Sequence, residues 1–521
     1  MEPAGFSEQV VHLKASIARI KKGVNEELDN LSAALDKLSS ECKSPPENQP
    51  SYKEIHLRKK SGSGDGLPEK VFLLRDSRIV ELMANQHLRT VFNMCVAFLF
   101  LVCIILLISY VYDPQRMHED MSTIILNSAG FLTVLGFLVA FNFSILFLLH
   151  PCLQLWAHCK TTVRSGLLDV IFASLFLAYL GVFMVVPPHH ILTHNFPPLS
   201  AVILAFEQVR LLMKLYAYTR EVVKKVNKYI HIKGSSSTNN IELKLPEMSS
   251  LLYFLFAPTL VFRENYPRTP SVRWGVALWY LSNFLGCILL YSVVLNHFIK
   301  DLFRDAGKDD FQLLGFTLTA CTILILGSIS LLLMFYGFLH CWLNLFAELL
   351  RFGDRLFYLD WWNSTTYADY YRSWNLVVHD WLFTYVYADT WMIFNHSKKA
   401  AMLVVFMLSA VVHEYILAVA YGFFFPVVLC VFGTAGVAFV FVTKKKTGHV
   451  WNVFLWITLI SGWGMILVFY TVEFYARINC QQTRGDVADF FLPRSLSLSC
   501  HTFSHSIWFS PPLYRAKVPA L

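Results

Sequence analysis

The sequence predicts an all-α protein that crosses a lipid bilayer about nine times, and three features of the chain support this fold class. Of its 521 residues, 55% are hydrophobic and only 15% are charged, whereas soluble domains carry about 25% charged residues. The hydrophobic residues are gathered into runs and are not spread with the spacing of amphipathic helices. These runs have about 20 residues, the length that spans the roughly 30 Å hydrocarbon core of a bilayer.

Polar or mixed stretches separate the predicted spans, and the longest of them are 219–272 and 339–399. Within the fourth span Glu207 and Arg210 are three residues apart, so they share one helical face. Charged side chains at membrane depth face protein or a cavity, which predicts that this helix lines part of the interior. The predicted spans are 91–112, 124–149, 166–187, 198–218, 274–298, 312–338, 400–424, 426–443 and 450–473.

Residues 1–42 are predicted to form a cytosolic segment that associates with other copies of the chain. Within residues 8–42 the apolar residues recur mostly at alternating spacings of three and four, which is typical of a coiled coil. The alternative is an amphipathic helix lying on the bilayer, but Glu27, Asp29 and Asp36 make its polar face too acidic for an anionic membrane surface. We therefore expect a homo-oligomer, either a dimer or a tetramer.

Three further segments complete the predicted organisation. Residues 43–90 form a linker, flexible and rich in Pro, Gly and Ser as far as residue 70, and then the cytosolic approach to the first span. Residues 91–475 form the membrane domain. Residues 476–521 form a luminal tail.

The positions of lysine and arginine predict the orientation of the chain. The net charge is +8, and the basic residues lie mostly in short loops between apolar runs, with no signature of nucleic-acid binding. Basic residues before the first span place the N-terminus in the cytosol. If the fairly apolar segment 376–394 does not span, Lys444, Lys445 and Lys446 also lie in the cytosol and the C-terminus lies in the lumen. The eleven cysteines show no metal-ligand spacing, so we expect no metal site.

Polar residues able to react are concentrated between residues 340 and 415. The stretch from Phe357 to Asn363, FYLDWWN, places four aromatic residues around one acid and one amide. An interfacial aromatic belt would explain the tryptophans. It does not explain the Arg, Asn, His and Asp residues that follow in the run YYRSWNLVVHDW at 370–381.

His413 stands near the middle of the predicted seventh span, in the sequence SAVVHEY at 409–415. An ionisable residue within a membrane span is a functional-site hypothesis by default, and a neutral imidazole suits a general base. The alternative is a histidine that only forms a hydrogen bond between helices. Ser409 lies on the same helical face as His413, whereas Glu414 points about 100° away. The sequence contains no phosphate-binding glycine loop, nucleophile elbow or metal cluster, which favours direct transfer onto an acceptor hydroxyl without a cofactor.

The three motifs FYLDWWN, YYRSWNLVVHDW and SAVVHEY, in this order, resemble those of the sterol O-acyltransferases of the membrane-bound O-acyltransferase family. The similarity extends from about residue 75 to about residue 480. It implies an endoplasmic-reticulum enzyme with nine spans around a reaction chamber. That enzyme would transfer a long-chain acyl group from acyl-CoA to the 3-hydroxyl of a sterol.

The resemblance also implies roles for individual residues. His413 is the expected catalytic base and Asn375 its essential companion. Three positions depart from the family pattern. Asp369 stands where the family has Asn, and Lys398 is followed by Lys399 where relatives have a Lys-Ser pair. Asn93 stands where some relatives have a histidine implicated in sterol contact. The residues expected to contact acyl-CoA are Asp369, Arg372, Asn375, His379, Tyr387, Lys398 and Ser409, and those of the aromatic motif are Phe357, Tyr358, Asp360, Trp361, Trp362 and Asn363.

Other implications concern the tail and the identity of the acceptor. A luminal Cys480–Cys500 disulfide is expected, but the 21 residues after Cys500 match nothing in the family. The expected partners are acyl-CoA, sterol and membrane lipid. Diacylglycerol is the alternative acceptor, because relatives that use it share the aromatic motif and the histidine. A lipid-binding or transport protein without catalysis is the alternative from a different class.

Overall fold

The computed structural model describes residues 58–59, 67–163, 166–194, 196–235, 242–304, 313–480, 482 and 484–495. The chain divides into two units, residues 1–71 and 72–521. In the first unit the described residues form two short antiparallel strands, β1 (Arg58–Lys59) and β2 (Glu69–Lys70). The coiled coil predicted within residues 8–42 lies outside the described residues and stays a prediction.

The described part of the second unit is built from helices, as predicted. Short π-helical segments, labelled η1, η2, η3, η5 and η6, interrupt several of them, and η4 is a 3-10 turn. The first helices are α3 (Arg78–Leu82), α4 (Gln86–Tyr112), α5 (Pro114–Asn127), α6 (Phe131–Ser144), η1 (Ile145–Leu149), α7 (His150–Val163), α8 (Gly166–Thr193), α9 (Pro198–Ser235), α10 (Met248–Phe256), α11 (Trp274–Val294), η2 (Leu295–Ile299) and α12 (Lys300–Phe303). The remaining ones are α13 (Leu313–Met334), η3 (Phe335–Trp342), α14 (Leu343–Leu349), η4 (Trp361–Asn363), α15 (Tyr367–Trp374), α16 (Leu376–Trp381), η5 (Leu382–Tyr387), α17 (Ala388–Ile393), α18 (Lys398–Tyr421), η6 (Leu429–Gly436), α19 (Val437–Val442), α20 (His449–Asn479) and α21 (Asp486–Phe491).

Seven helices in the described residues are long and apolar enough to cross a membrane. The two other predicted spans coincide with α9, which carries three charged residues in its first half, and with the short helix Leu429–Val442. The segment 376–394, predicted not to span, forms the helix α16–η5–α17, which is not among the seven. The seven are Gln86–Tyr112, Phe131–Val163, Gly166–Thr193, Trp274–Phe303, Thr317–Leu349, Lys398–Tyr421 and His449–Asn479. The chain is therefore a multi-pass membrane protein of the predicted all-α class.

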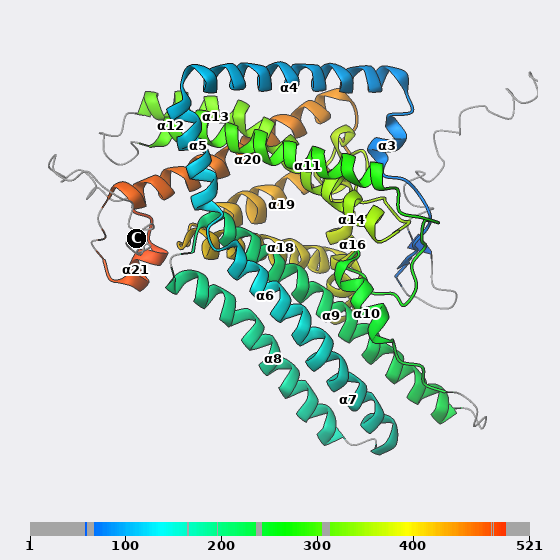
Figure 1. Cartoon of the computed structure of the whole chain (residues 1–521). Helices are drawn as coiled ribbons and strands as arrows, with labels where there is room; N and C mark the ends of the chain where they lie inside the picture. Colours follow the sequence, from blue (N-terminus) through cyan, green and yellow to red (C-terminus); the bar gives the residue numbers. More distant parts are fainter. Residues whose placement is uncertain are drawn as a thin grey trace, which may run out of the picture. The chain divides into compact units, whose positions relative to one another are not determined.

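Helix α9 connects several of the other helices. In Figure 1, α8, α9 and the nearly continuous helix α6–η1–α7 run side by side. Helix α18, which carries the candidate histidine, packs along α9. Because α9 contacts α6, α7, α8, α10 and α18, it is the element against which the candidate site is positioned.

Buried polar groups explain the length and the charges of α9. Lys214 is buried, and its Nζ donates to the backbone carbonyls of Phe254, Leu255 and Ala257 at 2.6, 2.9 and 2.8 Å. A cation is favoured at the C-terminal end of a helix, where carbonyls lack intrahelical partners, and here that helix is α10. The charges of α9 thus fasten a neighbouring helix.

The Glu207–Arg210 pair has a similar role. Arg210 Nη2 lies 2.7 Å from a Glu207 carboxylate oxygen, and Arg210 Nη1 donates to the Leu255 carbonyl at 2.8 Å. The pair faces protein, as its shared helical face predicts. The neighbouring helix is α10, and the sequence did not predict this contact.

The approach to the first span is also held to the helical unit. Arg75 forms a bidentate ion pair with Asp354, at 2.6 and 3.0 Å. Arg78, at the start of α3, does the same with Asp360, at 2.6 and 2.9 Å. The last part of the predicted linker segment is therefore a fixed part of the fold.

Candidate functional site

His413 lies in the second half of α18, on the stripe of that helix that faces the protein. Met402, Phe406 and Ser409 share this stripe at spacings of four and three residues. Met402 and Phe406 pack against the main hydrophobic core. His413 nevertheless keeps exposed surface, although its ring lies deep among other protein atoms.

Hydrogen bonding determines which nitrogen of His413 is basic. Nδ1 lies 2.7 Å from the backbone carbonyl oxygen of Ser409, and because a carbonyl can only accept, Nδ1 carries the proton. In the neutral ring Nε2 then holds the lone pair. The described part of the chain provides no hydrogen-bond partner for Nε2. In the neutral ring Nε2 can therefore accept a hydrogen bond.

The two residues that follow this histidine hold α18 from two sides. Glu414 is buried and accepts hydrogen bonds from the Tyr470 hydroxyl and, at 3.1 Å, from the Leu429 backbone N–H. Tyr415 donates its hydroxyl proton to Gln208 Oε1 at 2.8 Å. Glu414 faces away from the imidazole, as the sequence predicts. Together the two contacts fix the rotation of α18 and thereby the direction of the imidazole.

Asn375 lies between α15 and α16 and is the N-cap of α16. Its Oδ1 accepts a hydrogen bond from the Val378 backbone N–H at 3.1 Å, which is the preferred role of Asn at this position. Because the amide oxygen is committed to the cap, the NH2 group must point away from the helix end. No acceptor for this NH2 group occurs among the described residues, so it is available as a donor.

Aromatic contacts connect the helix before Asn375 to the histidine. The Tyr371 ring packs against Phe432 with centroids 5.2 Å apart, and Phe432 packs against His413 at 5.7 Å. A Cβ at Gly436 would lie 2.5 Å from the Tyr371 hydroxyl oxygen, so this approach requires glycine. Burial raises the pKa of the Tyr371 hydroxyl above its ordinary value, which keeps it protonated.

Of the residues expected to contact acyl-CoA, Asp369 and Arg372 lie on the exposed side of α15. Arg372 Nη2 is 2.7 Å from Asp369 Oδ1, and both side chains are at least half exposed. Asp369 also accepts from the Thr366 hydroxyl at 2.9 Å. Lys398, the first residue of α18, is exposed as well. These groups lie where an ionic ligand could meet them.

His379 and Tyr387 form a column of stacked rings with Phe383 between them. The centroids are 6.3 Å apart from His379 to Phe383 and 5.2 Å apart from Phe383 to Tyr387, the latter pair being almost parallel. His379 Nδ1 is buried and makes no hydrogen bond within the described residues; the nearest Asp380 oxygen is 3.8 Å away. The π-helical segment η5 lies in this column, and such segments are frequent at functional sites.

The aromatic motif braces the fold around the site. Trp361 is buried against Phe335, Trp374 and Trp456. The Tyr358 hydroxyl bonds to His340 Nδ1 at 2.6 Å. In the same motif the Asp360 carboxylate accepts from Arg78. The Trp362 carbonyl accepts hydrogen bonds from Asn452 at 2.9 Å and from Trp456 at 3.1 Å. Phe357 is buried, whereas Asn363 is exposed. In the structure these side chains join α3, η3 and α20.

Two sequence expectations lie away from this cluster. Asn93 is an exposed residue of α4. Cys480 is disulfide-bonded, and the other described cysteines are free. Because Cys500 lies outside the described residues, its pairing with Cys480 stays a prediction.

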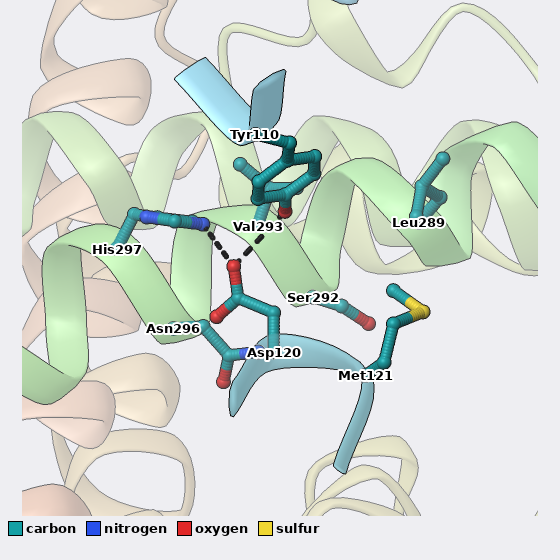
Figure 2. A pocket seen from close by; sticks show the side chains of 8 residues that line it. All are labelled: Tyr110, Asp120, Met121, Leu289, Ser292, Val293, Asn296 and His297. Atoms are coloured by element: carbon teal, nitrogen blue, oxygen red, sulfur yellow. Dashed lines mark hydrogen bonds and ion pairs between the residues drawn. The ribbon is translucent and has the colours of Figure 1, made fainter. Parts of the chain in front are cut away.

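A second polar cluster joins the end of α4 to α5 and η2, beside a pocket that α11 also lines (Figure 2). Asp120 accepts from the Tyr110 hydroxyl at 2.9 Å and lies 2.6 Å from His297 Nε2. Arg116 Nη2 lies 2.6 Å from His297 Nδ1. None of the site residues expected from the sequence lines the pocket beside it. Within the described residues, no His, Cys, Asp and Glu cluster could hold a metal ion.

Sequence reasoning missed the residues that orient the histidine, above all Gln208 and Tyr415. One signal pointed to the first of them. Pro187 and Pro188 lie inside α8 and have no N–H to pair with the carbonyls four residues earlier, those of Phe183 and Met184. Gln208 Nε2 donates to both carbonyls, at 2.9 and 3.1 Å.

Comparison with known proteins identifies the family of the chain. Residues 206–472 match the model of MBOAT, the membrane-bound O-acyltransferase family. The chain is 40% identical to sterol O-acyltransferase 1 of Mus musculus over 431 residues, which are 82% of this chain and 78% of that protein. It is 39% identical to sterol O-acyltransferase 2 of Rattus norvegicus and of Homo sapiens, over 83% of this chain and 81% of each relative. The chain therefore belongs to the membrane-bound O-acyltransferase family and is an acyltransferase.

Proposed function

We propose that this enzyme transfers a long-chain acyl group from acyl-CoA to the 3-hydroxyl of a sterol, with His413 as the general base. The observation that carries the proposal is the 2.7 Å contact of His413 Nδ1 with the Ser409 carbonyl, which leaves Nε2 as an accessible acceptor. The names of the relatives support the sterol as acceptor.

The proposed reaction has one nucleophilic substitution. His413 Nε2 takes the proton of the sterol hydroxyl while the sterol oxygen attacks the thioester carbonyl carbon. The new C–O bond forms, the C–S bond breaks, and the imidazolium returns the proton to the CoA thiolate. The products are a steryl ester and CoA.

Asn375 is proposed to stabilise the charge that develops on the thioester oxygen. Its cap bond to Val378 fixes the amide, so the NH2 donor is oriented before the substrate binds. Removal of a donor of this kind commonly costs about 3–4 kcal/mol of transition-state stabilisation. Arg372 and Lys398, both exposed, are proposed to meet the anionic part of acyl-CoA.

The proposed setting is the endoplasmic-reticulum membrane, with the N-terminus cytosolic and the C-terminus luminal. In this orientation the charged nucleotide of acyl-CoA stays in the cytosol while the sterol arrives through the lipid. A reaction chamber around the imidazole would exclude water and so limit hydrolysis of the thioester.

The test uses purified protein with labelled palmitoyl-CoA and either cholesterol or diacylglycerol. We expect cholesteryl ester from wild type and none above background from His413→Ala, with both proteins unfolding at similar temperatures. His158→Ala, a change at an exposed histidine of α7, is the matched control and should keep activity. Substantial transfer by His413→Ala would refute the base assignment. Transfer to diacylglycerol alone would refute the sterol as acceptor, and binding of both substrates without CoA release would indicate a non-catalytic lipid-binding or transport protein.

A further inference from the structure

The turn between α19 and α20 carries three consecutive lysines, Lys444, Lys445 and Lys446, and all three side chains are exposed. Lys445 has φ of +59°, a left-handed conformation that is unfavourable for a residue with a side chain. Lys446 Nζ lies 4.9 Å from the centroid of the Trp451 ring. The backbone of this turn is thus held in a form that glycine would adopt more easily, yet a lysine occupies it.

Two hydrogen bonds fasten the lysine turn to the segment that begins α15. The Tyr367 backbone N–H donates to Thr443 Oγ1 at 3.0 Å, and the Thr365 hydroxyl donates to the Lys446 carbonyl at 2.9 Å. Thr443 is fully buried. The three ammonium groups are therefore presented from a fixed turn and not from a loose loop.

From this turn a series of ring contacts leads to the candidate base. Tyr367 stacks on Phe439 with centroids 5.1 Å apart, and one turn further along α15 Tyr371 packs on Phe432, which packs on His413. Phe432, which contacts the base, and Thr443 of the turn are eleven residues apart along η6 and α19, so at no more than about 1.5 Å per residue the helix separates them by at most roughly 16 Å.

This separation matches the shape of an acyl-CoA. The thioester and the nucleotide phosphates are at opposite ends of an extended pantetheine arm. A donor whose thioester lies at the imidazole and whose pantetheine arm runs along α15 would place its phosphates at the end of α15 to which the lysine turn is attached. Lysine ammonium groups are well suited to bind phosphate as point charges.

We propose that Lys444, Lys445 and Lys446 form a binding site for the nucleotide phosphates of the acyl-CoA donor. The proposal rests on the function proposed above and adds a binding site to it. Basic residues in a cytosolic loop can also serve only to set orientation. A fixed turn with a left-handed lysine, attached to the helix that leads to the base, favours a ligand.

The test compares donors that differ in phosphate content. Wild type and the triple variant Lys444→Gln, Lys445→Gln, Lys446→Gln are assayed with palmitoyl-CoA, with palmitoyl-3′-dephospho-CoA and with S-palmitoyl-pantetheine, which has no phosphate. We expect the KM for palmitoyl-CoA to rise about tenfold in the variant, equivalent to about 1.4 kcal/mol, with kcat changed less than twofold. The KM for S-palmitoyl-pantetheine should change less than twofold.

A matched control removes the same charge elsewhere. The triple variant Lys224→Gln, Lys225→Gln, Lys228→Gln on α9 should leave the KM for palmitoyl-CoA within twofold of wild type. The proposal is overturned if the lysine-turn variant raises the KM for all three donors equally or for none.

Two further measurements distinguish donor binding by the lysine turn from lipid binding and from catalysis. Repeating the assay in vesicles of phosphatidylcholine alone and with added phosphatidylserine identifies lipid binding, because a defect seen only with the anionic lipid, for every donor, would overturn the proposal. Equilibrium binding of palmitoyl-CoA without acceptor separates this proposal from the proposed function. Wild type that binds the donor but esterifies no sterol would refute the function alone, whereas equal donor binding by wild type and variant would refute the lysine site alone.

Discussion

Gln208 of α9 bonds on one side to Tyr415, two residues beyond the candidate base, and on the other side to the two carbonyls that Pro187 and Pro188 leave without helical partners. The Tyr415 hydroxyl donates to Gln208 Oε1 at 2.8 Å, while Gln208 Nε2 donates to Phe183 and Met184. The buried Gln208 side chain thus connects these two carbonyls of α8 to α18, the helix that carries His413.

This relationship predicts different costs for its two partners. Gln208→Leu leaves two buried carbonyls and the Tyr415 hydroxyl without partners, and each unsatisfied group costs about 1–3 kcal/mol. Tyr415→Phe leaves only one amide oxygen unsatisfied. We expect the unfolding temperature in detergent to fall more for Gln208→Leu than for Tyr415→Phe. Tyr112→Phe, at a side chain that is 92% exposed, is the control and should leave it unchanged. Equal unfolding temperatures for all three variants would contradict the role of Gln208.

Asn375 permits a separation of its two roles. Aspartate is as good an N-cap as asparagine, but its carboxylate has no NH2 donor. We expect Asn375→Asp to unfold within a few degrees of wild type and to lose about 10²–10³-fold in acyl transfer. Asn375→Ala should lose both the activity and about 1 kcal/mol of stability.

The control for the cap alone is Asn85→Ala. Asn85 caps α4 by accepting from the His87 N–H at 2.9 Å, so its loss should lower stability and leave acyl transfer intact. Activity of Asn375→Asp comparable to that of wild type would show that the NH2 group is not needed.

Lys214 is predicted to hold the end of α10 in place through its three hydrogen bonds. Lys214→Met leaves the three carbonyls of Phe254, Leu255 and Ala257 unsatisfied in a buried site, so we expect a loss of several kcal/mol and poor recovery of folded protein after detergent extraction. Lys214→Arg should be intermediate, because guanidinium can still donate. Lys228→Met, at an exposed position of the same helix, should be recovered like wild type.

The sequence was sufficient for the helical class and for the family, because long apolar runs and short motifs in a fixed order are local signals. The role of His413 as a catalytic base stays a prediction. The sequence was not sufficient to predict how α9 packs, because Lys214 of this helix has its hydrogen-bond partners 40 or more residues away along the chain. The same holds for Gln208 and Tyr415, which are 207 residues apart in sequence. Such pairs form only when helices pack, and no periodicity within either helix encodes them.

The aromatic motif shows a different limit. Its composition suggested reactive chemistry, yet the structure places Trp361 in the core and pairs Asp360 with Arg78. A sequence pattern distinguishes poorly between residues that react and residues that hold the reacting groups in place. The direction of the Asn375 NH2 group could likewise not be predicted from the sequence, because the hydrogen bond of its Oδ1 to the Val378 N–H determines it.

The end of α20 predicts a dependence of stability on pH. Asp489 of α21 is buried, and Arg494 binds its carboxylate at 2.8 and 2.7 Å while Arg477 lies 3.1 Å away. The hydrogen bonds from Arg494, and further contributions from Arg477, hold the pKa of Asp489 below its ordinary value of about 3.9.

Because the folded-state pKa is depressed, the unfolded chain binds the proton more readily at acidic pH. The stabilisation by Asp489 is therefore fully present above pH of about 4 and is lost as the pH falls through the depressed pKa. We expect the unfolding temperature of Asp489→Asn to be lower than that of wild type at pH 6, and the difference to shrink towards pH 3. Asp486→Asn, at an exposed position of the same helix, should follow wild type at every pH. A constant difference between Asp489→Asn and wild type from pH 6 to pH 3 would show that packing, and not the charge of the carboxylate, makes Asp489 stabilising.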